Sequence, residues 1–183
     1  MKIVLVRHGK PNVDMKTRVS PGEMFSWIQT YDDSKVNESC PTPLLDSISV
    51  DDFLIVSSPL PRALASLDII GVEPAMIDSV FHEAHLPMLN ISRPKLSPLT
   101  NVFLLRVLWL MGYDKDVESY RLAKLRSASA AARLITLAEN YSSVLLMGHG
   151  IINRMIGSQL KRQGFGKIEV IGKSYWQADV YET

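Results

Sequence analysis

Two apolar runs, each ending at a histidine followed by a glycine, constrain this chain more than any other feature. The first spans residues 2–6 and is followed closely by His8, and the second spans residues 143–148 and leads directly into His149. Runs rich in Val, Ile and Leu of this length are typical of buried parallel strands. Ligands of open α/β sheets bind beyond the carboxyl ends of such strands. We therefore expect both histidines on one rim of a sheet, where each glycine allows the backbone to approach a ligand.

The rest of the chain alternates strands and helices within a single expected domain, residues 1–183. Strands are expected at residues 3–6, 53–56, 77–81, 143–148, 168–171 and 175–181. Helices are expected at residues 23–31, 61–70, 101–111 and 117–140, and after His149. This order predicts an α/β fold with a mostly parallel central sheet and helices on both faces. The segment at about 84–115 contains Pro87, Pro94 and Pro98 and is expected to form a small lid-like insertion.

The 117–140 helix needs an apolar face that packs on the sheet. Its larger apolar residues include Leu122, Leu125 and Ile135, and we expect these three, with Ala132, to form the buried stripe.

Composition excludes several classes of protein. The net charge of +1 lacks the basic bias of a nucleic-acid-binding surface. Arg7 interrupts the N-terminal apolar run, which argues against a signal peptide, and the apolar stretch 102–111 is too short to span a bilayer. The single cysteine, Cys40, allows no intrachain disulfide, which fits a reducing compartment. We expect a cytoplasmic protein without nucleic-acid or membrane partners.

Two arginines join the histidines at the predicted rim. Arg7 directly precedes His8, and Arg62 follows Ser57-Ser58-Pro59 at the start of a predicted helix. The planar guanidinium group matches the geometry of phosphate and carboxylate, and a helix N-terminus adds backbone N–H donors. This combination predicts a phosphate pocket in which one histidine is neutral and nucleophilic, while the other is protonated and donates to the phosphate.

Three ordered motifs resemble those of the histidine phosphatase superfamily, also called the phosphoglycerate mutase-like family. They are Arg7-His8-Gly9, then residues 57–63 with Arg62, then residues 144–150 with His149. The resemblance extends from residue 3 to about residue 160 and implies a phosphoglycerate mutase-like fold.

The resemblance also implies a mechanism without metal or cofactor. His8 would attack a phosphoryl group and become phosphohistidine, while Arg7, Arg62 and His149 bind the phosphoryl oxygens. Glu83, which follows the third predicted strand, would protonate the leaving oxygen and then activate water.

The chain departs from the family pattern after His8. Lys10 stands where a small polar residue or Glu is commoner, and we expect it to be solvated. Asp14 occupies the place of a phosphate-binding Asn and would repel phosphate, so we expect it to point away. Asn12 is the nearest amide and is a candidate for phosphate binding.

Other charged residues have competing interpretations. His82 and His85 flank Glu83-Ala84, but they lack the spacing of the helical zinc motif and a clear third ligand. Arg93 and Lys95 are interpreted as surface charge, with contact to the substrate's leaving group as the alternative. Arg154 is interpreted as structural.

The function that this pattern favours is hydrolysis of a small phosphomonoester, with a phosphoprotein as the alternative substrate. A phosphoglycerate mutase-type phosphotransferase, a protein phosphohistidine phosphatase and a non-catalytic phospholigand-binding protein remain alternatives. A mutase usually encloses its substrate with longer insertions, for which 183 residues leave little room. The sequence leaves the oligomeric state open.

Overall fold

A mixed, mostly parallel sheet forms the centre of the molecule. The computed structural model describes residues 1–37 and 47–183, so Cys40 lies outside the described residues. The strands are β1 (Lys2–Arg7), β2 (Leu54–Ser57), β3 (Met76–Ile77), β4 (Ser143–Gly148), β5 (Gly166–Ile171) and β6 (Ala178–Glu182). Their order is β3-β2-β4-β1-β6-β5. The pairs β1–β4, β2–β4 and β2–β3 are parallel, and β6 runs antiparallel to both its neighbours. The predicted sheet is confirmed.

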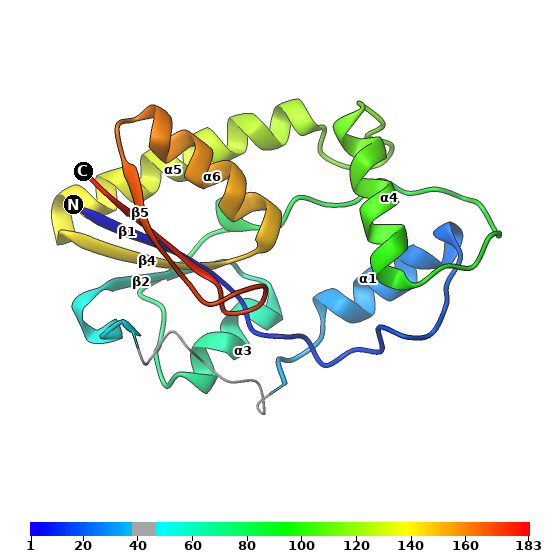
Figure 1. Cartoon of the computed structure of the whole chain (residues 1–183), viewed down its shortest axis with the longest axis horizontal. Helices are drawn as coiled ribbons and strands as arrows, with labels where there is room; N and C mark the ends of the chain where they lie inside the picture. The colour runs from blue at the N-terminus through cyan, green and yellow to red at the C-terminus, as the bar shows by residue number, and fades with distance from the viewer. Residues whose placement is uncertain (38–46) are drawn as a thin grey trace.

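Helices cover both faces of the sheet, as expected. The described α-helices are α1 (Met24–Asp32), α3 (Pro61–Ile69), α4 (Pro98–Leu110), α5 (Tyr120–Tyr141) and α6 (Gly150–Arg162), of which α3, α5 and α6 cover the sheet (Figure 1). Figure 1 shows α5 and α6 on one face and α3 on the other. Side chains alternate along a strand, so Ile3 and Leu5 of β1 pack in the core beneath α5 and α6. Val4 and Val6 pack in the core shared with α3. No helix in the described parts of the chain has the length and apolarity needed to cross a membrane.

The third strand is shorter than the expected 77–81. After two residues the chain turns into a 3-10 helix, Ser79–Phe81. The Asp78 side chain causes this change, because its carboxylate accepts a hydrogen bond (2.9 Å) from the Val80 N–H and caps the helix. Phe81 is nevertheless fully buried in the core.

The buried stripe of α5 differs from the expected one. Leu122 and Leu125 are about half exposed. The face that packs inward instead consists mainly of small residues: Ala123, Ser127, Ala130, Ala131, Leu134 and Ala138. Small side chains allow a helix to approach its neighbours closely, and α5 packs against both α6 and β4. Of the expected stripe, Ile135 packs against the core as predicted, whereas Leu122, Leu125 and Ala132 lie on the exposed side.

Two helices stand apart from the layers that cover the sheet. In Figure 1, α1 and α4 lie beyond the ends of β1 and β4 that are farthest from the chain termini. They share a small core of their own, in which Met24 of α1, Leu105 of α4 and Leu86 are buried. Ser97 caps α4 by accepting a hydrogen bond (3.2 Å) from the Thr100 N–H. Leu86 and α4 fall within the expected insertion at about 84–115, whereas α1 comes from an earlier part of the chain. The action of the insertion as a lid stays a prediction.

The corrected face of α5 leads to a test of stability. Leu134→Ala should lower the free energy of unfolding by about 2–5 kcal/mol, because it leaves a cavity in the core. Leu125→Ala on the same helix should change it by less than about 0.5 kcal/mol, because that side chain is 59% exposed. Urea unfolding followed by circular dichroism measures both values. Equal losses in the two variants would contradict the assigned face.

Candidate active site

The pairing of β1 with β4 brings the two histidines together. Arg7 lies opposite Gly148 in the parallel register, so the next residues, His8 and His149, leave the sheet side by side. Their ring centroids are 5.1 Å apart, and both side chains are buried. The two motifs therefore converge at one rim of the sheet.

Hydrogen bonds define the state of the His8 ring. Nδ1 lies 2.7 Å from the Gly9 carbonyl oxygen, which can only accept, so Nδ1 carries the proton. Nε2 is then unprotonated and accepts a hydrogen bond (3.2 Å) from Arg62 Nε. Burial lowers the pKa of His8 well below its ordinary value, and the charge of Arg62 lowers it further. His8 is therefore a neutral imidazole with its lone pair on Nε2.

Arg62 is oriented by residues of α1. It begins the first turn of α3 after Pro61, and its side chain is almost fully buried. Its Nη1 forms an ion pair with Asp32 Oδ1 at 2.6 Å. The guanidinium carbon lies 4.9 Å from the centre of the Tyr31 ring. Asp32 and Tyr31 thus fix the plane of the guanidinium and direct Nε toward His8.

Arg7 is held in a similar way by the segment before β6. Its guanidinium carbon lies 4.4 Å from the centre of the Tyr175 ring. Its Nη1 donates a long hydrogen bond (3.5 Å) to the Ser174 carbonyl. Its Nε is buried and has no hydrogen-bond partner within the described part of the chain. A buried donor without a partner calls for an explanation, and an anion bound beside it would satisfy it.

His149 contacts His8 but does not line the pocket described below. Its Nε2 lies 2.7 Å from Ser58 Oγ, and its buried Nδ1 has no partner among residues 1–37 and 47–183. Burial lowers the pKa of His149 well below its ordinary value, and the charge of Arg62 lowers it further. The free protein therefore favours a neutral His149, and a protonated His149 that donates to a bound phosphate stays a prediction. The ring is neutral because it is desolvated beside a cation.

Glu83 lies where α6 begins. Its carboxylate accepts hydrogen bonds from the N–H groups of Ile151 (3.1 Å) and Ile152 (2.9 Å), and from its neighbour Ala84 (3.0 Å). The Ile151 and Ile152 N–H groups belong to the first turn of α6 and have no partner within the helix. A negative charge at this end is favourable. Glu83 therefore caps α6 and also lines the same pocket as His8.

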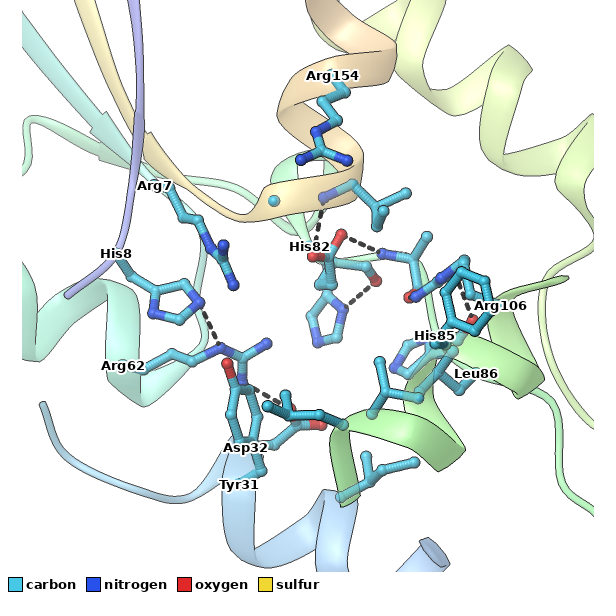
Figure 2. A pocket seen from close by; sticks show the side chains of 18 of the residues that line it. Arg7, His8, Tyr31, Asp32, Arg62, His82, His85, Leu86, Arg106 and Arg154 are labelled. Carbon is cyan, nitrogen blue, oxygen red and sulfur yellow. Dashed lines mark hydrogen bonds and ion pairs between the residues drawn. The ribbon is translucent and has the colours of Figure 1, made fainter. Parts of the chain in front are cut away.

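The pocket has a volume of about 530 Å³, within the range of about 300–1,000 Å³ typical of small-molecule sites. Arg7, His8, Arg62 and Glu83, all predicted from the sequence, line it. Figure 2 shows the first three on one side, while Arg106, His85 and Leu86 lie on the opposite side. His82 and Arg154 lie between these two groups in the same view.

Several lining residues were missed or interpreted differently. Tyr31, Asp32 and Tyr175 belong to no motif and reach the site only through the tertiary fold. Arg154, interpreted as structural, lines the pocket and forms no salt bridge within the described residues. Its position could have been inferred, because it lies four residues after Gly150 and so one turn along the same helix face.

Other candidates lie outside the pocket. The Asn12 side chain is exposed and lies outside the lining residues, so the structure does not bring it to the site. Asp14 points away, as expected, and accepts hydrogen bonds from the Lys16 and Thr17 N–H groups. Lys10 is exposed, also as expected. Lys95 forms an ion pair with Glu23 at 3.0 Å, and neither it nor Arg93 lines the pocket.

Two further features differ from simple expectations. A Cβ atom at Gly9 would lie 2.7 Å from the Trp176 ring and would also collide with Val36. Gly9 therefore permits core packing rather than the approach of a ligand.

The His82 and His85 rings lie 4.7 Å apart. No group of three or more His, Cys, Asp or Glu side chains suited to a metal occurs in the described segments.

Comparison with known proteins gives structural neighbours only. The sequence matches no protein-family profile and no curated protein. A phosphoserine phosphatase from Entamoeba histolytica, solved with 3-phosphoglyceric acid, has a TM-score of 0.61 at 16% identity. The alignment covers 98% of this chain and 89% of that one.

Two further solved structures agree with this result. A mycobacterial glucosyl-3-phosphoglycerate phosphatase has a TM-score of 0.56 at 20% identity, covering 88% of this chain and 79% of that one. A protein from Thermus thermophilus has a TM-score of 0.58 at 19% identity, with coverage of 98% and 92%. The structural neighbours are histidine phosphatase superfamily members. The chain has the phosphoglycerate mutase-like fold of these proteins, as its three motifs predicted.

Proposed function

We propose that this protein hydrolyses phosphate monoesters through a phosphohistidine formed at His8 Nε2. The observation that carries this proposal is the orientation of the His8 ring. Its proton is held on Nδ1 by the Gly9 carbonyl, and its Nε2 lone pair lies beside Arg62 in a pocket of ligand size. A neutral, oriented imidazole beside a cation is suited to attack an anionic phosphorus centre.

The other site residues supply charge and hydrogen bonds. Arg7 and Arg62 would bind the non-bridging oxygens and stabilise the negative charge of the transition state. The unpaired Arg7 Nε is a ready donor. His149 becomes a second neutral donor if the Ser58 hydroxyl donates to its Nε2 and leaves the proton on Nδ1.

The reaction then proceeds in two balanced steps. Arg62 Nε–H turns from His8 Nε2 to a phosphoryl oxygen, His8 Nε2 attacks phosphorus, and the ester P–O bond breaks. The leaving oxygen takes a proton from Glu83, which enters this step in its acid form. Water next attacks the phosphohistidine, Glu83 accepts its proton, and the P–N bond breaks to release inorganic phosphate. Glu83 thus gives one proton to the leaving oxygen and regains one from water, and we propose that no metal or cofactor takes part.

The pocket supports a small phosphorylated substrate over a phosphoprotein, because α1 and α4 contribute walls opposite the sheet rim. The Entamoeba histolytica phosphatase was solved with 3-phosphoglyceric acid, and a mutant of it with phosphoserine. We also propose a cytoplasmic location, which the single cysteine favours.

Removing the nucleophile tests the proposal directly. His8→Ala should lower turnover of p-nitrophenyl phosphate by about 10³-fold or more, measured with EDTA present. Labelled substrate quenched in alkali should leave phosphate on the wild-type chain and none on the variant. Lys10→Ala is the matched control, because Lys10 is nearby, exposed and outside the pocket. Near-wild-type activity of His8→Ala would refute the mechanism.

The role of Glu83 can be separated from its capping of α6. As a general acid, Glu83→Gln should slow an alkyl phosphate by about 10²–10⁴-fold, because its leaving oxygen needs a proton. It should slow p-nitrophenyl phosphate far less, because that leaving group is stable as an anion. A purely structural role would reduce both rates by the same factor. Steady-state kinetics with both substrates, at matched folded fractions, measures the difference.

The neutral histidines predict a pH dependence. His8 and His149 should each titrate below the ordinary histidine pKa of about 6.5. The unfolded chain then binds these protons more readily, so the free energy of unfolding should fall as pH decreases from about 6.5. In Arg62→Gln the His8 midpoint should rise, because a cationic neighbour is lost. NMR titration of the imidazole carbons checks this, and a midpoint above 6.5 in the wild type would contradict it.

A further inference from the structure

The pocket has a second half that the proposed chemistry does not use. Its walls are apolar and come mainly from α1 and α4. The residues are Trp27, Ile28, Leu86, Leu99, Val102, Phe103, Val107 and Leu110. A phosphoryl group bound at His8 fills only part of a pocket of about 530 Å³. The remaining volume therefore faces the group attached to the phosphate.

The α4 part of this wall is one stripe of the helix. Leu99, Phe103 and Leu110 recur at helical spacing on one side. They are 59%, 66% and 54% exposed, so the stripe is not covered by the core of the protein. The same stripe belongs to the pocket that contains His8, which makes it continuous with the phosphate end of the site.

Charged groups on this side are already engaged. Arg106 donates hydrogen bonds to the carbonyl oxygens of Ala84 (2.8 Å) and His85 (3.3 Å), and it stacks on the Trp109 ring at 4.6 Å. Lys95 pairs with Glu23 away from the pocket. The apolar wall itself therefore contains no uncommitted Arg or Lys among the described residues, whereas Arg154, which forms no salt bridge in the described part of the chain, lies between this wall and the His8 side of the pocket (Figure 2).

We propose that the substrate is the phosphate monoester of an apolar alcohol, with its hydrocarbon part against α1 and α4. The proposal rests on the phosphate end of the proposed function. Hydroxyl or carboxylate groups of a sugar phosphate or a phosphorylated hydroxy acid that lie against the apolar side chains of α1 and α4 would lose water without gaining hydrogen bonds, which is unfavourable. The polar lining residues His82, His85 and Arg154 lie outside these two helices. A hydrocarbon chain gains affinity there with every methylene group that it buries.

Binding of n-alkylphosphonates tests the wall independently of turnover. Ethyl-, butyl- and hexylphosphonate carry the same head group and differ only in buried hydrocarbon. Calorimetry with the wild-type protein should show affinity rising by up to about fourfold per added methylene. Equal affinities, or affinities that fall with chain length, would overturn the proposal.

Two substitutions in α4 test whether the rise in phosphonate affinity with chain length arises from contacts inside the pocket. Phe103→Ala should reduce the ratio of hexyl to ethyl affinity, because Phe103 lines the pocket. Leu104→Ala is the matched control, since Leu104 is a neighbouring, 45% exposed apolar residue that lies outside the pocket lining. A ratio unchanged in Phe103→Ala, or lowered equally in Leu104→Ala, would contradict the assignment.

Kinetics with ethyl, butyl and hexyl phosphate distinguishes this proposal from the proposed function. The three leaving oxygens have similar basicity, so kcat/KM should follow the chain-length dependence of phosphonate binding. Turnover without that dependence would refute the apolar-substrate inference alone. Chain-length-dependent binding without turnover of any alkyl phosphate or p-nitrophenyl phosphate would support the apolar binding wall and refute the proposed function.

Discussion

The parallel pairing of β1 with β4 is the constraint on which the site depends. The register that places Arg7 opposite Gly148 ends both strands at the same level. The turns that follow deliver His8 and His149 to one place, and α6 begins there with Gly150. The neighbouring strand β2 leads into α3 at the same rim and brings Arg62. A shift of one residue in this pairing would move one histidine away from the other.

The site concentrates positive charge before any ligand binds. Three arginines, Arg7, Arg62 and Arg154, line one pocket. Of these three, only Arg62 forms a salt bridge with an acidic side chain in the described part of the chain, and that partner is Asp32. Both histidines respond by remaining neutral, because protonation would add charge in a desolvated place. A phosphate dianion would remove the repulsion among the guanidinium groups. The electrostatics thus favour an anion and keep the His8 imidazole neutral at the same time.

The sequence predicted the parts of the site that follow strand ends, since apolar runs identify strands and parallel strands share a rim. It missed Tyr31 and Asp32 because α1 approaches Arg62 only through the tertiary fold. It also assigned Gly9 a role near ligand, whereas close packing against Trp176 requires that glycine. Asp78 ended the third strand early through a local side-chain hydrogen bond, which outweighed the apolar pattern of 77–81.

The two halves of the pocket rest on different cores. The phosphate end belongs to the sheet and its covering helices, whereas the apolar wall is supported by the small core shared by α1 and α4. The ion pair between Asp32 and Arg62 joins the two halves. Under the proposed function, substitutions on the exposed stripe of α4 would therefore change which phosphate ester binds while the histidines and arginines keep their geometry. Substitutions at the end of α1 cannot act so selectively, because Asp32 also orients the guanidinium that contacts His8.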